Sequence, residues 1–220
     1  MERMIIVGTG QQSQVVAYYI MMQGAYEIVG YFDIDTSKWG KSIASIPILS
    51  GYKDYESEYL RKAEDILQTH HFYVALGNMK ARRKLFEFFI RCGWIPVDIV
   101  HPAATVSLGA RLGKGVMIEA GCLITPNPII GDNVVINTGS QVNHDNQIAD
   151  HVYIASGVIL SGGVQVGEGS LIDGGVIVTL GKKVGRNSII GAGSVVTKDI
   201  PDNVIAYGNP CRVIRDNVQW

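Results

Sequence analysis

The side chain in this sequence best suited to proton transfer is His144, which is followed directly by the carboxylate of Asp145. An unperturbed imidazole has a pKa of about 6.5, so it is largely neutral at neutral pH and able to accept a proton. A nearby carboxylate raises that pKa and makes the ring a stronger base. The pair therefore offers general-base chemistry, with an exposed polar corner of the fold as the alternative.

A six-residue repeat in the second half of the chain positions this pair. From Val106 to Val196 every sixth residue is Val, Ile or Leu without a break. An α-helix has about 3.6 residues per turn and would carry these residues off one face. A simple alternating strand would place apolar residues at the intervening steps as well. One short strand and one corner per hexad, with three hexads to a coil, explain the period and predict a triangular parallel β-helix of about five coils.

The first hundred residues predict a separate α/β domain, with a short parallel sheet that begins as a βαβ unit. The turn Gly8-Thr9-Gly10 and the acidic Asp33 start a dinucleotide-binding fingerprint, but Ser13 stands where its last glycine belongs. This favours a nucleotide-sugar site over a dinucleotide site or a purely structural turn. We expect strands at 4–7, 27–32, 72–78 and 94–100, helices at about 13–23 and 81–91, an α/β domain over 1–100, and a β-helix over 101–220 with a C-terminal cap from about 198.

The order of these parts resembles the nucleotide-sugar N-acetyltransferases of bacterial glycan synthesis, which are often grouped with sialic-acid O-acetyltransferases. One departure from the family is Gln11-Gln12, where Gly-His is usual, so the nucleotide and sugar preferences do not carry over. The matching segments run through nearly the whole chain and are Gly8 to Ser13, Gly30 to Asp35, Ala75 to Asn78, Ile136 to Asp145, and Gly208 to Arg212.

The resemblance implies a left-handed β-helix and an acetyl-CoA-dependent transfer to the amine of a UDP-, dTDP- or GDP-linked amino-dideoxyhexose. It marks His144 as the general base and Asp145 as its support. It also implies a homotrimer with active sites between subunits. The coenzyme A contacts that it implies are Tyr153, Gly174 and Ala192, and the expected nucleotide-sugar contacts are Gly10, Gln11, Gln12, Asp33, Asp35, Gly77 and Asn78.

Residues eighteen apart should stack in neighbouring coils, so the corner positions form three columns. One column is entirely small and predicts a shallow groove for an extended pantetheine arm, with close packing between subunits as the alternative. A second column is charged and is expected to be solvated. The small column is Thr138, Ser156, Gly174 and Ala192; the charged column is Lys114, Asp132, Asp150, Glu168 and Arg186; and the third includes Pro126, His144, Gly162 and Leu180.

Three other functions remain open. Sialic-acid-type O-acetylation would use the same base, and a non-catalytic nucleotide-sugar-binding protein would not bind coenzyme A. A zinc enzyme of the γ-carbonic-anhydrase kind needs three convergent imidazoles. Within the coils the only histidines are His144 and His151, and His151 is interpreted as structural. No metal is therefore expected.

The net charge, hydropathy and cysteine content indicate which partners and which cellular compartment to expect. A net charge of −1 argues against general binding to nucleic acid or to a membrane surface, and no apolar stretch is long enough to span a bilayer. Cys92, Cys122 and Cys211 are odd in number and far apart, so they form no disulfide framework. We therefore expect a cytoplasmic protein.

Overall fold

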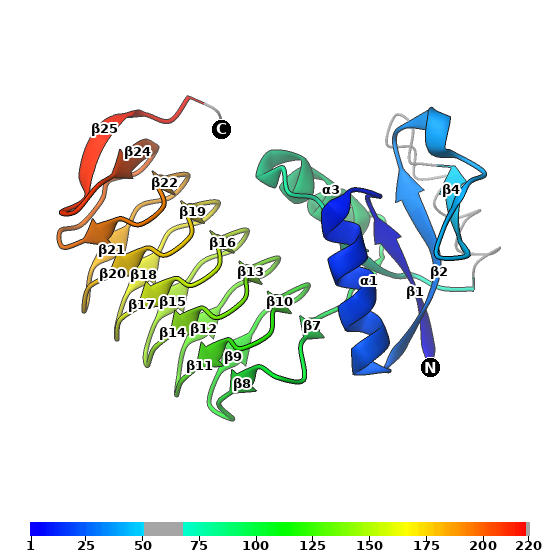
Figure 1. Cartoon of the computed structure of the whole chain (residues 1–220), viewed down its shortest axis with the longest axis horizontal. Coiled ribbons are helices and arrows are strands. Elements are labelled where there is room, and N and C mark those ends of the chain that lie inside the picture. The colour runs from blue at the N-terminus through cyan, green and yellow to red at the C-terminus, as the bar shows by residue number, and fades with distance from the viewer. Residues whose placement is uncertain (51–67, 219–220) are drawn as a thin grey trace. The chain divides into compact units, whose positions relative to one another are not determined.

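The computed structural model describes residues 1–50 and 68–218. The chain divides into two compact units, Met1–Ile99 and Val100–Trp220 (Figure 1). Among the described residues, no helix is long and apolar enough to cross a membrane.

The first unit is built on a six-stranded sheet with the strand order β3-β4-β2-β1-β5-β6. The central strand β1 is paired in parallel with β2 and β5, and β4 and β6 continue the parallel order on either side. Only β3 is antiparallel. The carboxyl ends of the parallel strands therefore meet at one edge of the sheet. The strands are β1 (Glu2–Val7), β2 (Tyr26–Asp33), β3 (Ser42–Ile43), β4 (Ile46–Ser50), β5 (His71–Val74) and β6 (Ile95–Pro96).

Among the described residues, two α-helices connect strands of this sheet. Helix α1 (Gln11–Gln23) begins two residues earlier than its sequence suggested and ends at Gly24, whose φ of 68° closes it in the left-handed conformation. Helix α3 (Met79–Arg91) is capped by Asn78, whose side chain accepts the N–H of Ala81. A short 3-10 helix, η1 (Thr36–Lys38), follows β2.

The core of the first unit is aromatic. Phe89 of α3 is fully buried and stacks on Phe72 of β5 with ring centroids 4.8 Å apart. Trp94 packs edge-on against Phe89 at 5.4 Å. Large aromatic side chains contribute much of the free energy gained by apolar burial. These contacts therefore hold α3 on the sheet and fix its position relative to the strands.

The second unit is the triangular parallel β-helix that the six-residue repeat predicts, with the left-handed coiling that the family resemblance implies (Figure 1). Two-residue strands recur every six residues, and each pairs in parallel with the strand eighteen residues on, as Ile136 does with Ile154. The repeat anchors from Ile118 onward are buried, while Val106 and Leu112 in the first coil are partly covered. The strands are β7 (Ile99–Val100), β8 (Thr105–Val106), β9 (Arg111–Leu112), β10 (Met117–Ile118), β11 (Leu123–Ile124), β12 (Ile129–Ile130), β13 (Val135–Ile136), β14 (Gln141–Val142), β15 (Gln147–Ile148), β16 (Tyr153–Ile154), β17 (Ile159–Leu160), β18 (Gln165–Val166), β19 (Leu171–Ile172), β20 (Ile177–Val178), β21 (Lys183–Val184), β22 (Ile189–Ile190) and β23 (Val195–Val196).

These strands form three faces. The first face contains β10, β13, β16, β19 and β22, the second contains β8, β11, β14, β17, β20 and β23, and the third contains β9, β12, β15, β18 and β21. Sixteen strands from β8 to β23, at three to a coil, make five coils and one further strand. The prediction of about five coils is confirmed.

The corners between faces turn through residues with positive φ. Between Gly115 and Gly193 these residues are Gly or Asn at every corner except two, Asp145 and His151, which both have φ of 61°. A side chain with a Cβ is disfavoured in this conformation, less so for short polar residues such as Asp and Asn. At Asp145 and His151, backbone conformational preference does not explain the residue type. We infer that the side chain is needed at these two corners.

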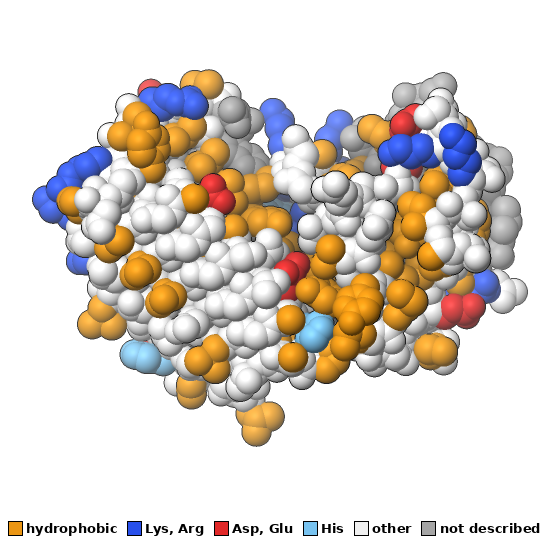
Figure 2. Space-filling view, viewed as in Figure 1, with side chains coloured by type: hydrophobic (Ala, Val, Ile, Leu, Met, Phe, Trp, Pro, Cys, Tyr) orange, Lys and Arg blue, Asp and Glu red, His pale blue; other side chains and the backbone are white. Residues whose placement is uncertain are grey.

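A short β-ribbon follows the last coil. β24 (Val204–Tyr207) continues the first face beside β22, and β25 (Arg212–Asp216) returns antiparallel to it. Val204, Ala206 and Cys211 belong to the buried core of the coils. The ribbon therefore covers apolar side chains at the C-terminal end of the prism, and basic side chains gather on the surface there (Figure 2).

Candidate functional site

His144 and Asp145 form a direct pair on the corner between the second and third faces. The Nδ1 atom of His144 lies 2.8 Å from Oδ2 of Asp145, and the other carboxylate oxygen accepts the side-chain N–H of Asn127 at 3.4 Å. These two hydrogen bonds hold the pKa of Asp145 below its ordinary value. An ionised Asp145 fixes the proton of the imidazole on Nδ1 and leaves Nε2 as the proton acceptor.

The backbone of Asp145 adopts a positive φ at this corner, where its side chain pairs with His144. Its φ of 61° belongs to a corner position that elsewhere is almost always Gly or Asn. Both side chains are well exposed, at 60% for His144 and 62% for Asp145, so apolar burial does not explain the residue choice. A disfavoured conformation retained at a corner of this kind points to a functional constraint.

Replacing Asp145 by Asn separates the carboxylate from the corner conformation. Asn turns such corners elsewhere in this chain, as at Asn133 and Asn187, so we expect the thermal unfolding midpoint to be unchanged. Without the negative charge, kcat should fall by about tenfold or more, because the imidazole loses the partner that fixes its tautomer and orientation. Steady-state kinetics with a melting curve test this, and an unchanged kcat would show that the carboxylate has no part in proton transfer.

The imidazole of His144 lies directly over Gly162 of the next coil. A Cβ atom on Gly162 would be 2.4 Å from Nε2 and 2.5 Å from Cε1 of the ring. Gly162 is buried, and its N–H has no acceptor among the described residues. Buried N–H groups are nearly always paired. A backbone N–H that lacks a protein acceptor, beside the nitrogen left to accept a proton, is a candidate donor to a developing oxyanion.

The expected coenzyme A contacts lie elsewhere on the prism. Gly174 and Ala192 occupy the corner between the first and second faces, in neighbouring coils joined by a 2.8 Å bond from the Gly193 N–H to the Gly174 carbonyl. Tyr153 lies on β16 of the first face, where its hydroxyl accepts the side-chain N–H of Asn137 at 2.9 Å. Within one chain, the second face separates these residues from His144.

The small corner column is open, and the charged column is largely exposed while also bonding to the backbone of neighbouring coils. Thr138, Ser156 and Ala192 are exposed along the first column. In the charged column, Asp132 accepts the backbone N–H of Lys114 at 2.8 Å, and Asp150 accepts that of Asp132 at 2.7 Å. These carboxylates therefore cap turns of the neighbouring coil, while Lys114, Asp150 and Arg186 are exposed, as expected of a solvated column.

The residues expected to bind the nucleotide sugar follow β1, β2 and β5 and therefore share one sheet edge. Gly8 between β1 and α1 has φ of 106°, and a Cβ there would be 2.9 Å from the carbonyl oxygen of Ala75. Ser13, in place of the fingerprint glycine, is fully buried and donates to the Gly10 carbonyl at 2.6 Å. The turn between β1 and α1 is therefore compact even without the third glycine of the fingerprint. The expected nucleotide-sugar contacts that share this edge are Gly10, Gln11, Gln12, Asp33, Asp35, Gly77 and Asn78.

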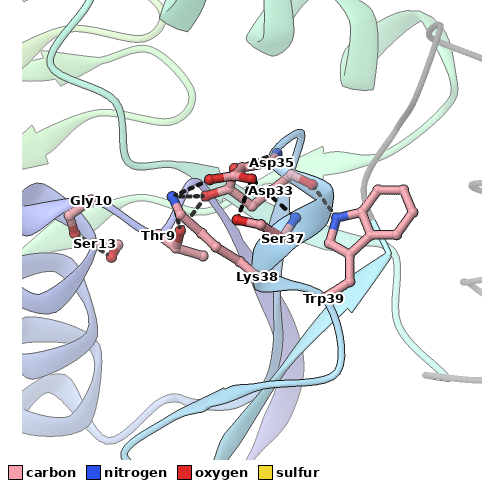
Figure 3. A network of polar contacts seen from close by, with 8 residues as sticks. All are labelled: Thr9, Gly10, Ser13, Asp33, Asp35, Ser37, Lys38 and Trp39. Carbon is pink, nitrogen blue, oxygen red and sulfur yellow. Dashed lines mark hydrogen bonds and ion pairs between the residues drawn. The ribbon is translucent and has the colours of Figure 1, made fainter.

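Asp33 is the centre of a polar network at this edge (Figure 3). Its Oδ1 accepts the N–H of Asp35 at 2.9 Å, and its Oδ2 accepts the Thr9 hydroxyl and the Lys38 ammonium, the latter at 3.1 Å. Burial opposes ionisation, but the hydrogen bonds from Thr9, Asp35 and Lys38 outweigh it and lower the pKa of Asp33. The roles of Thr9 and Lys38 as partners of Asp33 could not be predicted from the sequence, because only the fold brings them to Asp33.

Asp33 should make the first unit sensitive to acid. Because its pKa is lower in the folded state than the ordinary 3.8, its stabilisation is complete above that value and is lost as the pH falls through the folded pKa. Asp33→Asn should lower the free energy of unfolding by on the order of 2 kcal/mol at neutral pH, with the difference vanishing in strong acid. Fluorescence of Trp39 and Trp94, both in the first unit, can follow this; a difference that persists in acid would contradict the assignment.

A convergent metal site is not formed by the described residues, in which no three His, Cys, Asp or Glu side chains cluster. His144 and His151 lie on different corners, and His151 Nδ1 contacts the Asn133 amide at 2.9 Å. The three imidazoles that the zinc hypothesis requires are therefore not brought together in this part of the chain.

Comparison with known proteins connects both units to one kind of enzyme. Residues 3–89 match the PglD N-terminal domain, and residues 181–198 match the hexapeptide repeat of succinyl-transferase. No curated protein matches. A histidine-to-asparagine mutant of perosamine N-acetyltransferase from Caulobacter crescentus, solved with CoA and GDP-perosamine, is 31% identical, with 98% of each chain covered and a TM-score of 0.87.

Two further solved structures are similar over nearly the full length. The acetyltransferase domain of PglB from Neisseria gonorrhoeae FA1090, in complex with acetyl coenzyme A, is 29% identical, covers 97% of this chain and 99% of its own, and has a TM-score of 0.85. WeeI from Acinetobacter baumannii AYE is 22% identical, with 97% and 100% covered and a TM-score of 0.84. At that identity WeeI supports the fold alone.

Proposed function

Because the chain belongs to the nucleotide-sugar N-acetyltransferases with a left-handed β-helix, we propose that it transfers the acetyl group of acetyl-CoA to the amine of a nucleotide-linked amino sugar. The observation that carries this proposal is the His144–Asp145 pair beside the open N–H of Gly162. The likeness over 98% of the chain to an enzyme solved with CoA and GDP-perosamine supports it.

The chemistry follows from the geometry of the His144 corner. The sugar amine attacks the thioester carbonyl carbon, a C–N bond forms, and Nε2 of His144 takes the proton that the nitrogen releases. The carbonyl oxygen becomes an oxyanion, which the Gly162 N–H stabilises. Collapse of this intermediate breaks the C–S bond, and the imidazolium returns the proton to the departing coenzyme A thiolate. Asp145 stabilises the imidazolium while it carries that proton.

The cofactor is acetyl-CoA, with its pantetheine arm along the small corner column at Gly174 and Ala192 and with Tyr153 near one end. Because the second face separates these residues from His144, a complete site needs the cofactor corner of one chain and the His144 corner of another. This supports a homotrimer with active sites between subunits. In solution such an assembly has three times the 23.9 kDa mass of one chain.

The first unit holds the nucleotide at the edge formed by β1, β2 and β5. The first turn of α1 contains no acidic residue, and helix N-termini attract phosphate groups. Three free thiols, at Cys92, Cys122 and Cys211, are suited to a reducing compartment, so we place the reaction in the cytoplasm.

The test is release of free coenzyme A from acetyl-CoA in the presence of UDP-, dTDP- and GDP-linked amino sugars, with free sialic acid as a hydroxyl acceptor. Rapid release with one nucleotide-linked amino sugar is expected. Release only with the hydroxyl acceptor would retain the role of His144 and overturn the role of the first unit. No release with any acceptor would contradict the proposed activity.

A further inference from the structure

We propose that Lys38 contacts the diphosphate of the nucleotide-linked substrate, and that Asp33 is a positioning residue that holds Lys38 for this contact. The proposal rests on the proposed function and adds to it a residue in the nucleotide site. It also changes the role of Asp33 from a direct substrate contact to a support.

The position of Lys38 is fixed by the network in Figure 3. Its ammonium donates to the hydroxyl of Thr9 at 3.0 Å and to Asp33 at 3.1 Å. Thr9 precedes Gly10, the residue that caps α1. The lysine follows β2 in sequence, but its charge therefore lies at the turn between β1 and α1. A third ammonium proton is left over, since Asp35 is 3.8 Å away.

Asp33 has little free hydrogen-bonding capacity or exposed surface for contact with a substrate. Both of its oxygens are occupied by donors from Asp35, Thr9 and Lys38, and its side chain is 10% exposed. The side chain of Lys38 is 39% exposed. Of this pair, the lysine is therefore the group that a ligand can reach.

Lys38 offsets negative charge at the sheet edge where the nucleotide is proposed to bind. Asp33 and Asp35 both have lowered pKa values, Asp33 through the hydrogen bonds that outweigh its burial and Asp35 chiefly through the Ser37 hydroxyl and N–H. Both carboxylates are thus ionised at neutral pH and would repel a diphosphate. Lys38 is the only cation that contacts both among the described residues. Without it, the edge would disfavour the anionic part of the substrate.

The experiment compares the binding of a nucleoside diphosphate and of its nucleoside by titration calorimetry. UDP, dTDP and GDP are screened on the wild-type chain, and the tightest binder is kept. Lys38→Met should raise the dissociation constant of that diphosphate by about tenfold or more. The dissociation constant of the nucleoside should not change, and the salt dependence of diphosphate binding should decrease. Lys38→Arg should recover part of the loss. Lys41→Met is the matched control, since Lys41 is exposed on the same segment and, unlike Lys38, its ammonium forms no ion pair with Asp33 or Asp35.

A double-mutant cycle tests the positioning role of Asp33. Asp33→Asn should weaken diphosphate binding when Lys38 is present, because the lysine is no longer held. In the Lys38→Met background the same change should strengthen binding, because only repulsion is removed. Equal effects in both backgrounds would overturn the role of Asp33.

The remaining outcomes separate this inference from the proposed function. Unchanged diphosphate binding in Lys38→Met, with the wild type binding well, would overturn the contact alone. Failure of the wild-type chain to bind any of the three diphosphates would overturn the nucleotide site itself, and the contact with it. Coenzyme A binding, measured on each variant, shows that the prism remains folded.

Discussion

Replacing His144 by Ala is expected to lower kcat/KM for the amino-sugar acceptor by about 10²- to 10⁴-fold, the range that removal of a general base costs. The side chain is exposed and its ring contacts are with Asp145 and Gly162. Loss of the ring therefore removes no buried apolar packing. The unfolding midpoint and the dissociation constants of coenzyme A and of the nucleotide should stay near their wild-type values.

The matched control for this change is His151→Ala. His151 is the other histidine of the coils and has the same φ of 61°, but it lies on a different corner and contacts Asn133. Its replacement should leave kcat within about twofold of the wild type, since it touches no reacting group. Full activity in His144→Ala, or an equal loss in both variants, would show that His144 does not act as the base.

Gly162→Ala is expected to lower kcat by about 100-fold, the typical cost of displacing a catalytic group by about 1 Å. The added methyl would meet Nε2 of His144 at 2.4 Å, far inside van der Waals contact. Gly162 has no positive φ, so the backbone accepts alanine without strain and only the ring has to move. Steady-state kinetics on the purified variant measure the effect.

The effect of Gly162→Ala should depend on the histidine. In a His144→Ala background the clash is absent, so the second substitution should cost little further activity. Independent, multiplying losses would mean that Gly162 acts on the reaction by another route. An unchanged kcat in the single variant would mean that the close approach of the ring to the glycine has no catalytic consequence.

The β-helix could be predicted from the sequence because its information is local and repeated. An apolar anchor every sixth residue from Val106 to Val196 fixes the strand, the corner and the coil together. The same count placed His144 and Gly162 in one column, eighteen residues apart. The column showed that the two are neighbours, but it could not show that the ring covers the glycine, since that depends on the rotamer that Asp145 selects.

The α/β unit was less predictable, because its contacts are between segments distant in sequence. The expected helices and the first two expected strands lie within a few residues of those observed, although α1 begins at Gln11 and not at 13, since Gly10 needs no side chain to start a helix. The strand expected at 72–78 is β5, which ends at Val74, and the strand expected at 94–100 is two short strands, β6 and β7. The strands β3 and β4 were not predicted. The carboxylate of Asp33 was expected to face the substrate. Its partners Thr9 and Lys38 lie 24 and 5 residues away in sequence, and no short motif links them.

The separation of His144 from Gly174 and Ala192 follows from the columns counted in the sequence, which place them at different corners. His144 lies six residues beyond Thr138, so it belongs to the next corner of the same coil. We propose that a second chain completes a site that spans these two corners, as the family resemblance implied; the three-faced geometry supports this proposal.

The most direct test of N-acetylation is the identity of the product formed from acetyl-CoA and the best nucleotide-linked amino sugar. We expect one added acetyl group per sugar, detected by mass spectrometry, which survives mild alkali because it is an amide on the former amine. An acetyl group that mild alkali removes would be an ester on a hydroxyl and would contradict N-acetylation, and an unmodified sugar beside released coenzyme A would contradict acetyl transfer altogether.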